Sequence, residues 1–253
     1  MNGDTEDKLF AARLGDLVSR CERDGVCCFS NFLDERQCAE AQRWCLNNSG
    51  GLMYTLYGGF PEAKRRILAV FPDYYQDYIT DEFPIKCLTF TFRKEDRLSH
   101  RDFLGSFMGM RLKRDVIGDI IVDEGIAQAF VTDIAARLIL STVSKIGKTG
   151  VKVCGDRPFQ LEVKQEFRNI SGTVASMRLD CVVSLAAGIS RENAAKLIRS
   201  EKVDINHFKA SSISQELHAG DVLSIRGCGR FILSDINGST KKGRIHINLR
   251  KFI

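Results

Sequence analysis

The chain has 253 residues, of which 44% are hydrophobic and 27% are charged. This composition is that of a folded globular protein and excludes an intrinsically disordered chain, while the length predicts two or three domains. No uncharged apolar run is long enough to cross a membrane, and the acidic start MNGDTEDK lacks the features of a signal peptide. We therefore expect a cytoplasmic protein without a membrane anchor.

Nine cysteines and four histidines are scattered along the sequence. No two cysteines have the C-x-x-C spacing of a zinc site, so we expect no metal ion and no cofactor. In a cytosolic protein, cysteines of this kind are small apolar core residues with reduced thiols.

The net charge of +5 is unevenly distributed. Residues 175–253 hold thirteen Lys and Arg against seven Asp and Glu, whereas the preceding 174 residues hold twenty-four against twenty-five. A basic segment beside a neutral body is typical of nucleic-acid-binding proteins, although a solvated basic surface gives the same count.

Residues 1–80 are predicted to form a mostly helical domain. Apolar residues from Leu9 to Cys21 recur at helical spacing, and a second amphipathic stretch begins at Asp34. A Gly-Gly pair at 58–59 is expected to form a turn before a basic helix. The basic residues of that helix, which are candidate secondary RNA contacts or merely solvated, are Lys64, Arg65 and Arg66.

Residues 83–158 alternate between strand and helix patterns in the order βαββαβ, which is typical of ferredoxin-like and RNA-recognition folds. The first helix is predicted to begin after Ser99, with Asp102 in the capping-box position, and the second to end at Gly147. Phe130 lies in the strand that carries base-stacking aromatic residues in RNA-recognition folds. Only the Ala-Phe-Val centre of that strand matches, which favours a core position for Phe130.

The tripeptide HRD at residues 100–102 also occurs in protein-kinase catalytic loops, but the other kinase motifs are absent from this sequence. His100 and Arg101 are therefore candidates either for a secondary RNA contact or for capping and packing of their own helix.

The polar residues 159–177, with a Ser-Gly break, predict an extended connector. Residues 178–253 predict two helices, the first ending at Gly188 and the second with Ser190 as its N-cap, followed by short strands and a hairpin. Asn237-Gly238 is expected to form the turn of the hairpin. The residues expected at its tip and exit are Lys241, Lys242 and Arg244.

The pattern RLD…SR…A..LI…V.IN…L..GD.LSIRG resembles the small RNA-binding domain named after ribosomal protein S-four, also called the alpha-L motif. The extension RGCGRF…GSTKKGR and the middle segment HRDFLGSFMGMRLKRDVIGDIIV are similar to the YlmH family of bacterial S-four-domain proteins. The resemblance extends from about residue 55 to the end. Many S-four domains have glycines where this chain has Glu201 and His207.

The resemblance implies an α+β multidomain protein with a helical N-terminal domain, a βαββαβ ferredoxin-like or RRM-like middle domain and a small alpha-L domain. It implies a non-catalytic protein that acts on the large ribosomal subunit in ribosome-associated quality control, where it holds peptidyl-tRNA during alanine tailing of stalled chains. The expected partners are large-subunit rRNA, tRNA and the alanine-tailing factor, and the chain is expected to be a monomer. A link to cell-division gene clusters leaves a second hypothesis, a protein-interaction adaptor that RNA only anchors.

The candidate contacts to phosphate and ribose groups are expected to form one surface that recognises RNA shape. They are Arg178, Ser190, Arg191, Lys196, Arg199, Lys202, Arg226, Arg230, Lys241, Lys242 and Arg244. Pseudouridine synthases carry an RLD motif with a catalytic aspartate, so an rRNA-modifying enzyme that uses Asp180 is a third hypothesis. Because Asp180 opens a helix of the alpha-L motif here, and GSTKKG lacks P-loop spacing, we expect no catalytic residue.

Overall fold

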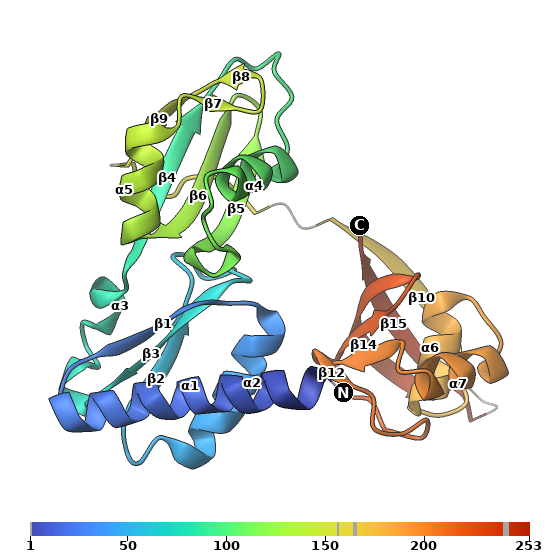
Figure 1. Ribbon diagram of the computed structural model, residues 1–253. Coiled ribbons are helices and arrows are strands. Elements are labelled where there is room, and N and C mark those ends of the chain that lie inside the picture. Colours follow the sequence, from blue (N-terminus) through green and yellow to red (C-terminus); the bar gives the residue numbers. More distant parts are fainter. Residues whose placement is uncertain (1, 156, 164–165, 240–242) are drawn as a thin grey trace. The chain divides into compact units, whose positions relative to one another are not determined.

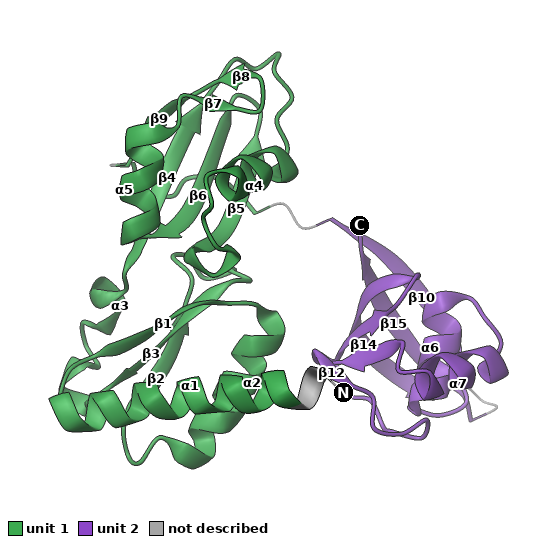
Figure 2. Ribbon diagram, viewed as in Figure 1, with its two compact units in different colours: residues 1–163 green, residues 164–253 purple. Residues whose placement is uncertain are grey.

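The computed structural model describes residues 2–155, 157–163, 166–239 and 243–253. The chain folds into two compact units, residues 1–163 and 164–253, which Figure 2 colours green and purple. Both units combine helices with antiparallel strands, so the prediction of a mixed α+β protein with several domains is confirmed. Within the described residues, no helix is long and apolar enough to span a bilayer.

The first unit begins with two helices and a three-stranded sheet (Figure 1). These elements are α1 (Asn2–Asp24), β1 (Cys28–Leu33), α2 (Glu35–Asn48), β2 (Met53–Tyr57) and β3 (Arg66–Phe71). The strands are antiparallel in the order β1-β3-β2, and both helices pack on one face of the sheet. Asp34 caps α2 through a capping box with Gln37, as its position predicted.

The prediction of a mostly helical domain for residues 1–80 was wrong, because it missed all three strands. No helix follows Gly59; the chain runs irregularly to β3, so that Arg66 begins a strand. The sequence of β3, RILAVF, is buried on both faces of the sheet. A strand buried in this way reads as a continuous apolar run, without the alternation that distinguishes a strand from a helix.

The rest of the first unit follows the predicted βαββαβ order. Its main elements are β4 (Ile85–Thr91), α4 (His100–Gly109), β5 (Ile117–Asp123), β6 (Ile126–Thr132), α5 (Asp133–Thr142), the hairpin β7 (Lys145–Ile146) and β8 (Thr149–Gly150), and β9 (Lys152–Cys154). Three short helices, Asp73–Tyr75, α3 (Ile79–Glu82) and Arg114–Val116, lie between the strands. The sheet order is β5-β6-β4-β9, and α4 and α5 pack on one face.

The capping box of Ser99 and Asp102 forms at the start of α4 as predicted. The second helix is shorter than expected, since α5 ends at Thr142 and Gly147 lies in the turn of the β7–β8 hairpin.

The two sheets of the first unit share an apolar cluster. Phe130 of β6 is only 2% exposed, and its ring centroid lies 4.9 Å from that of Phe60 and 5.2 Å from that of Phe159. Gly59, with φ +100°, lies so close that a Cβ atom there would overlap the Phe130 ring. The prediction that Phe130 is a core residue is therefore confirmed.

The second unit is a six-stranded antiparallel sheet with two helices (Figure 1). Its elements are β10 (Phe167–Val174), α6 (Leu179–Ala187), α7 (Arg191–Arg199), β11 (Val203–Ile205), β12 (Phe208–Lys209), β13 (Val222–Ile225), β14 (Gly229–Ser239) and β15 (Ile245–Phe252). The strand order is β10-β15-β14-β13-β11-β12. Alternate residues of these strands, among them Phe231, Leu233, Ile247 and Leu249, form one core with α6 and α7.

Two predictions for the second unit were wrong. Residues 167–174, expected in a connector, form β10, which pairs along its whole length with β15. Asn237 and Gly238, expected in the hairpin turn, lie within β14, where Asn237 pairs with His246. The predicted end of α6 at Gly188, whose φ is +66°, and the N-cap at Ser190 are confirmed.

Candidate nucleic-acid interface

A buried carboxylate organises the basic end of the α6–α7 pair. Asp180, in the first turn of α6, is 5% exposed. Its Oδ2 accepts hydrogen bonds from Arg191 Nη2 (2.6 Å) and Nε (3.2 Å), while its Oδ1 accepts one from Arg178 Nε (3.2 Å). Burial alone raises the pKa of Asp180, but the arginine hydrogen bonds outweigh it and hold that pKa below its usual value.

The same contacts orient the two predicted arginines. The side chain of Arg178 is 45% exposed and that of Arg191 is 56% exposed. Each guanidinium has five N–H donors in a fixed fork, so an arginine bonded to Asp180 keeps donors for a second anionic group. The Asp180 carboxylate therefore holds the Arg191 side chain in place.

Three further cations form what we call the basic cluster, defined as Arg199, Lys202 and Arg226. Arg199 ends α7, Lys202 lies three residues beyond it, and the backbone N–H of Arg226 donates to the carbonyl of Lys202 (2.9 Å). All three side chains are exposed. In the described part of the chain, no acidic side chain forms an ion pair with any of them.

Other predicted contacts have local structural partners. Lys196 Nζ lies 2.8 Å from the Glu192 carboxylate on the surface of α7. The Ser190 hydroxyl accepts the N–H of Asn193 (3.2 Å) and so caps the helix. Arg244 donates to the carbonyl of Thr173 in β10 (2.9 Å). Lys241 and Lys242 lie outside the described residues.

Arg230 does not belong to the surface of the helix pair, contrary to the prediction of one continuous surface. Its neighbour Phe231 points into the core shared with α6 and α7, so strand alternation directs Arg230 to the opposite face. There its guanidinium lies over the ring of Phe252, 4.9 Å from the centroid.

Two of the predicted secondary contacts in the first unit are bound to backbone. Arg65 donates to the carbonyl oxygens of Ile117 (2.9 Å), Phe32 (3.2 Å) and Arg114 (3.1 Å). Burial lowers the pKa of its guanidinium. Arg66 donates to the carbonyls of Ala63 (2.7 Å) and Pro61 (3.4 Å). These arginines therefore connect segments of the fold and do not extend from a basic helix.

The remaining secondary candidates lie at the start of α4 and beside β5. The backbone N–H of Lys64 donates to the Asp119 carboxylate. His100 is exposed at the start of α4, and partial desolvation of its ring together with the nearby Arg114 guanidinium lowers the pKa of His100. Arg101 is exposed.

In the β5-β6-β4-β9 sheet, the face with which RNA-recognition folds bind RNA is covered by another segment of the chain. The Gln128 side chain, on the same face as Phe130, donates to the Pro158 carbonyl (2.9 Å) and accepts the N–H groups of Gln160 (2.9 Å) and Leu161 (3.2 Å). The segment after β9 therefore lies across β6. Among the described residues, this sheet presents no open aromatic surface on which bases can stack.

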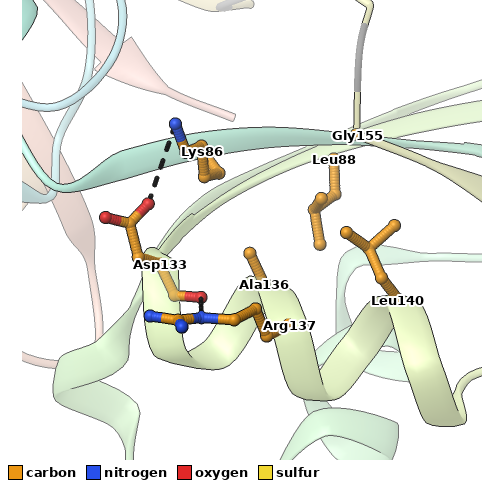
Figure 3. A pocket seen from close by; sticks show the side chains of 7 residues that line it. All are labelled: Lys86, Leu88, Asp133, Ala136, Arg137, Leu140 and Gly155. Carbon is orange, nitrogen blue, oxygen red and sulfur yellow. Dashed lines mark hydrogen bonds and ion pairs between the residues drawn. The ribbon is translucent and has the colours of Figure 1, made fainter.

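A hollow of about 440 Å³ opens between α5 and β4 on the surface of the middle domain. Figure 3 shows Lys86 pointing toward Asp133, with Nζ 3.8 Å from Oδ1, and Arg137 donating to the Asp133 carbonyl (3.5 Å). Leu88 and Leu140 form the apolar wall. Within the described residues, no group of three His, Cys, Asp or Glu side chains could hold a metal ion.

Part of this chain matches a known domain family. The domain family described as "Putative RNA-binding domain in YlmH" matches residues 79–159. The chain is thus an α+β multidomain protein whose residues 79–159 are similar to this domain family. The matched residues lie in the middle of the chain, whereas the basic residues of the sequence predicted RNA binding principally by residues 178–253.

Two known proteins are similar to this chain over more than half of its length. The chain is a homologue of the Bacillus subtilis (strain 168) "Ribosome-associated protein quality control protein P2", to which it is 29% identical over 228 residues, or 88% of this chain and 86% of that protein. The solved structure of "Cell division protein ylmH from Streptococcus pneumoniae" is 23% identical with a TM-score of 0.51, over 60% of this chain and 92% of that chain. This second likeness shows a shared fold.

Proposed function

We propose that the chain is a non-catalytic protein that binds structured RNA on the large ribosomal subunit and acts in ribosome-associated quality control. The observation that carries this proposal is the homology to the Bacillus quality-control protein over 88% of the chain. In this role it stabilises peptidyl-tRNA while alanine tails are added to stalled chains. Its partners are then large-subunit rRNA, tRNA and the alanine-tailing factor.

The second unit acts in this proposal as an RNA-binding module of the S-four type, in addition to the RNA-binding domain at residues 79–159. Two features support this assignment. The helix pair α6–α7 is followed by the antiparallel strands β11 and β13, in the order of the alpha-L pattern. Arg178 and Arg191 lie at the N-terminal ends of α6 and α7, and the residues of the basic cluster lie at the end of α7 and directly after α7 and β13. In these positions they can contact phosphate and ribose groups.

The geometry of Asp180 supports a structural role and argues against an RNA-modifying enzyme that uses this residue. Both carboxylate oxygens accept hydrogen bonds from arginines, and the side chain is only 7% exposed. Three arginine hydrogen bonds occupy most of the acceptor sites of this carboxylate, and its burial shields it from a substrate.

The proposal is tested by co-sedimentation of the full-length protein with purified large ribosomal subunits over a series of salt concentrations. Contacts to several phosphates make log affinity fall with log salt by about 0.7–0.9 per contact. Replacing Arg199 and Lys202 by alanine should weaken binding and reduce this slope by about 1.5. The matched control removes two exposed arginines of α1, Arg13 and Arg20, and should leave the slope unchanged.

A flat salt response of the unmodified protein would contradict RNA binding and favour the protein-interaction adaptor. Equal loss in the Arg199/Lys202 variant and in the α1 control would show that net charge alone drives association. Charge reversal of Lys241 and Lys242 extends the test to the hairpin, where loss of binding is expected if this segment contacts phosphate.

A further inference from the structure

The sheet of the second unit has a face turned away from α6 and α7, which we call the outer face. The residues of this face alternate with the core residues of the same strands. From β10 they are Phe167, Asn169, Ser171 and Thr173, from β15 His246, Asn248, Arg250 and Phe252, and from β14 Arg230, Ile232 and Ser234. The helices of this unit leave the outer face uncovered, unlike the covered sheet face of the middle domain.

Two arginines and two phenylalanines form a stacked row on this face. The Phe167 and Phe252 rings, paired across β10 and β15, have centroids 5.1 Å apart. Arg250 lies over the Phe167 ring at 4.7 Å, and Arg230 lies over the Phe252 ring at 4.9 Å. Cation–π contact fixes the planar guanidinium groups, and both aromatic rings and guanidinium planes are surfaces on which nucleic-acid bases stack.

A polar hollow of about 460 Å³ adjoins this row. Its lining residues are Asn169, Ser171, Ser234, Asp235, Asn248 and Arg250. The Ser171 hydroxyl donates to Asn248 Oδ1 (2.8 Å) and so orients that amide. The bulge in β14 beyond Leu233 turns the Asp235 carboxylate toward the same hollow. In the described part of the chain, no hydrogen bond engages the Asn169 amide, which keeps its donors and acceptor for a ligand.

We propose that the outer face binds an unpaired nucleotide of single-stranded RNA. The base stacks on the Arg250–Phe167 pair, and its edge enters the hollow. This inference rests on the proposed RNA-binding function and adds to it a second surface with a different ligand: single strands read through their bases, rather than folded RNA held through its phosphates.

The chemistry of the hollow fits a base better than a phosphate. Asp235 is an acceptor-only carboxylate, which repels a phosphate but accepts the N–H groups at the edge of a base. Asn169 can donate and accept hydrogen bonds, and Arg250 can donate them. Both the donor groups and the acceptor groups at the edge of a base therefore find partners in the hollow. The backbone phosphate beside the base would meet the exposed Arg250 and the half-buried Arg230.

A protein ligand is the less favoured alternative. Apart from Ile232, the outer-face residues between the phenylalanines and the hairpin are polar or charged, whereas the centre of a protein interface is depleted in charged residues. Base stacking, in contrast, needs only one aromatic or guanidinium plane for each base, and this face supplies such a plane next to hydrogen-bonding side chains.

The test measures fluorescence anisotropy of the full-length protein with two labelled RNAs, a twelve-nucleotide strand without self-complementarity and a sixteen-pair duplex. Replacing Arg250 and Asn169 by alanine should lower single-strand affinity by about ten-fold or more, because one stacked base and its edge contacts are lost. Duplex affinity and large-subunit binding should change less than two-fold. Arg168→Ala is the matched control. Arg168 neighbours Asn169 on β10 but points to the other face of the sheet, and its replacement removes one positive charge, as the replacement of Arg250 does.

Circular dichroism melting of each variant confirms that it is folded. The proposal is overturned if the Arg250/Asn169 variant keeps its single-strand affinity, or if Arg168→Ala reduces that affinity equally. It is also overturned if this variant loses large-subunit binding with unchanged single-strand affinity, which would identify a protein contact. If the unmodified protein binds large subunits but not the single strand, this inference alone is wrong, whereas failure to bind any of the three would contradict the proposed function as well.

Discussion

The Asp180 carboxylate lies 2.6 Å from the guanidinium of Arg191, which is eleven residues further along the chain and begins the next helix. Arg178, the residue before α6, donates to the other oxygen of the same carboxylate. One buried anion therefore fixes two basic side chains, one at the N-terminal end of α6 and one at the N-terminal end of α7. As an acidic residue in the first turn of α6, Asp180 also interacts favourably with the helix dipole.

Replacing Asp180 by asparagine should lower the free energy of unfolding by about 1–3 kcal/mol at pH 7, because charge-assisted hydrogen bonds become neutral ones. The pKa of Asp180 is lowered in the folded state. Its charged form therefore stabilises the fold above the unfolded-state pKa of about 3.9 and loses this effect as the pH falls through the lower folded-state value. Urea unfolding followed by circular dichroism should show a constant difference between the two proteins at pH 5–8 and a shrinking one below about pH 4. Equal stabilities at pH 7 would contradict the structural role of the carboxylate.

Arg191 and Arg199 should respond differently to replacement by alanine. Loss of Arg191 leaves Asp180 without its principal partner, so both the melting temperature and the affinity for large subunits should fall. Arg199 is exposed and has no ion-pair partner among the described residues, so its loss should weaken RNA binding and leave the melting temperature unchanged. Thermal melting and co-sedimentation of the two variants separate these effects. An unchanged melting temperature for Arg191→Ala would mean that the Asp180 contact does not contribute to folding.

Gly59→Ala should destabilise the first unit by about 3 kcal/mol or more, because the added methyl group overlaps the buried Phe130 ring and the backbone has φ +100°. Urea unfolding followed by the fluorescence of Trp44, the single tryptophan, reports on this unit. Gly51→Ala is the matched control, since its φ is +90° and a Cβ there meets no atom within 4 Å. The loss of stability in this control measures the cost of placing alanine in a backbone of positive φ, which is about 1–2 kcal/mol. Equal losses of unfolding free energy in the two variants would show that overlap with the Phe130 ring adds no cost.

Glu201→Gly should stabilise the second unit by about 1 kcal/mol. Glu201 follows the C-cap of α7 and has a φ of +54°. Two hydrogen bonds of 3.0 Å close this end of the helix, one from the Glu201 N–H to the Ile198 carbonyl and one from the Lys202 N–H to the Leu197 carbonyl. This Schellman arrangement strongly favours glycine at the position of Glu201. Glu201→Gln removes the charge but keeps the strained φ. Circular dichroism during urea unfolding should therefore show a gain only for glycine, and an equal gain for glutamine would assign the effect to charge.

Local signals explain which elements were predicted correctly. The caps at Asp34, Ser99 and Ser190 and the end of α6 at Gly188 depend on residues within one helical turn, which the sequence displays directly. The βαββαβ order of the middle domain was also predicted, because its strands and helices differ in apolar period. In contrast, β10 was missed because FRNISGTV is polar on its outer face and occupies the edge of the sheet.

The candidate contacts were predicted as a set of residues but not as an arrangement. Charge counts alone located the basic segment, and the structure then divided it: Arg199, Lys202 and Arg226 lie together, while Arg230 lies on the outer face. Asn169, Arg250 and Phe252 were not singled out at all. Their only signal is the alternation of the strands FRNISGTV and IHINLRKF, which becomes informative once β10 and β15 are known to pair.

The sequence by itself determined the mixed α+β class, the order of elements in the middle domain, the helix caps and the basic character of the last third, because each depends on residue identity and near neighbours. Only the tertiary structure decided that Arg65 binds three carbonyls, that Asp180 joins Arg178 and Arg191, and that one sheet face is covered while another is open. These features depend on contacts between residues far apart in the chain. Burial and strand pairing create such contacts, and a linear pattern does not record them.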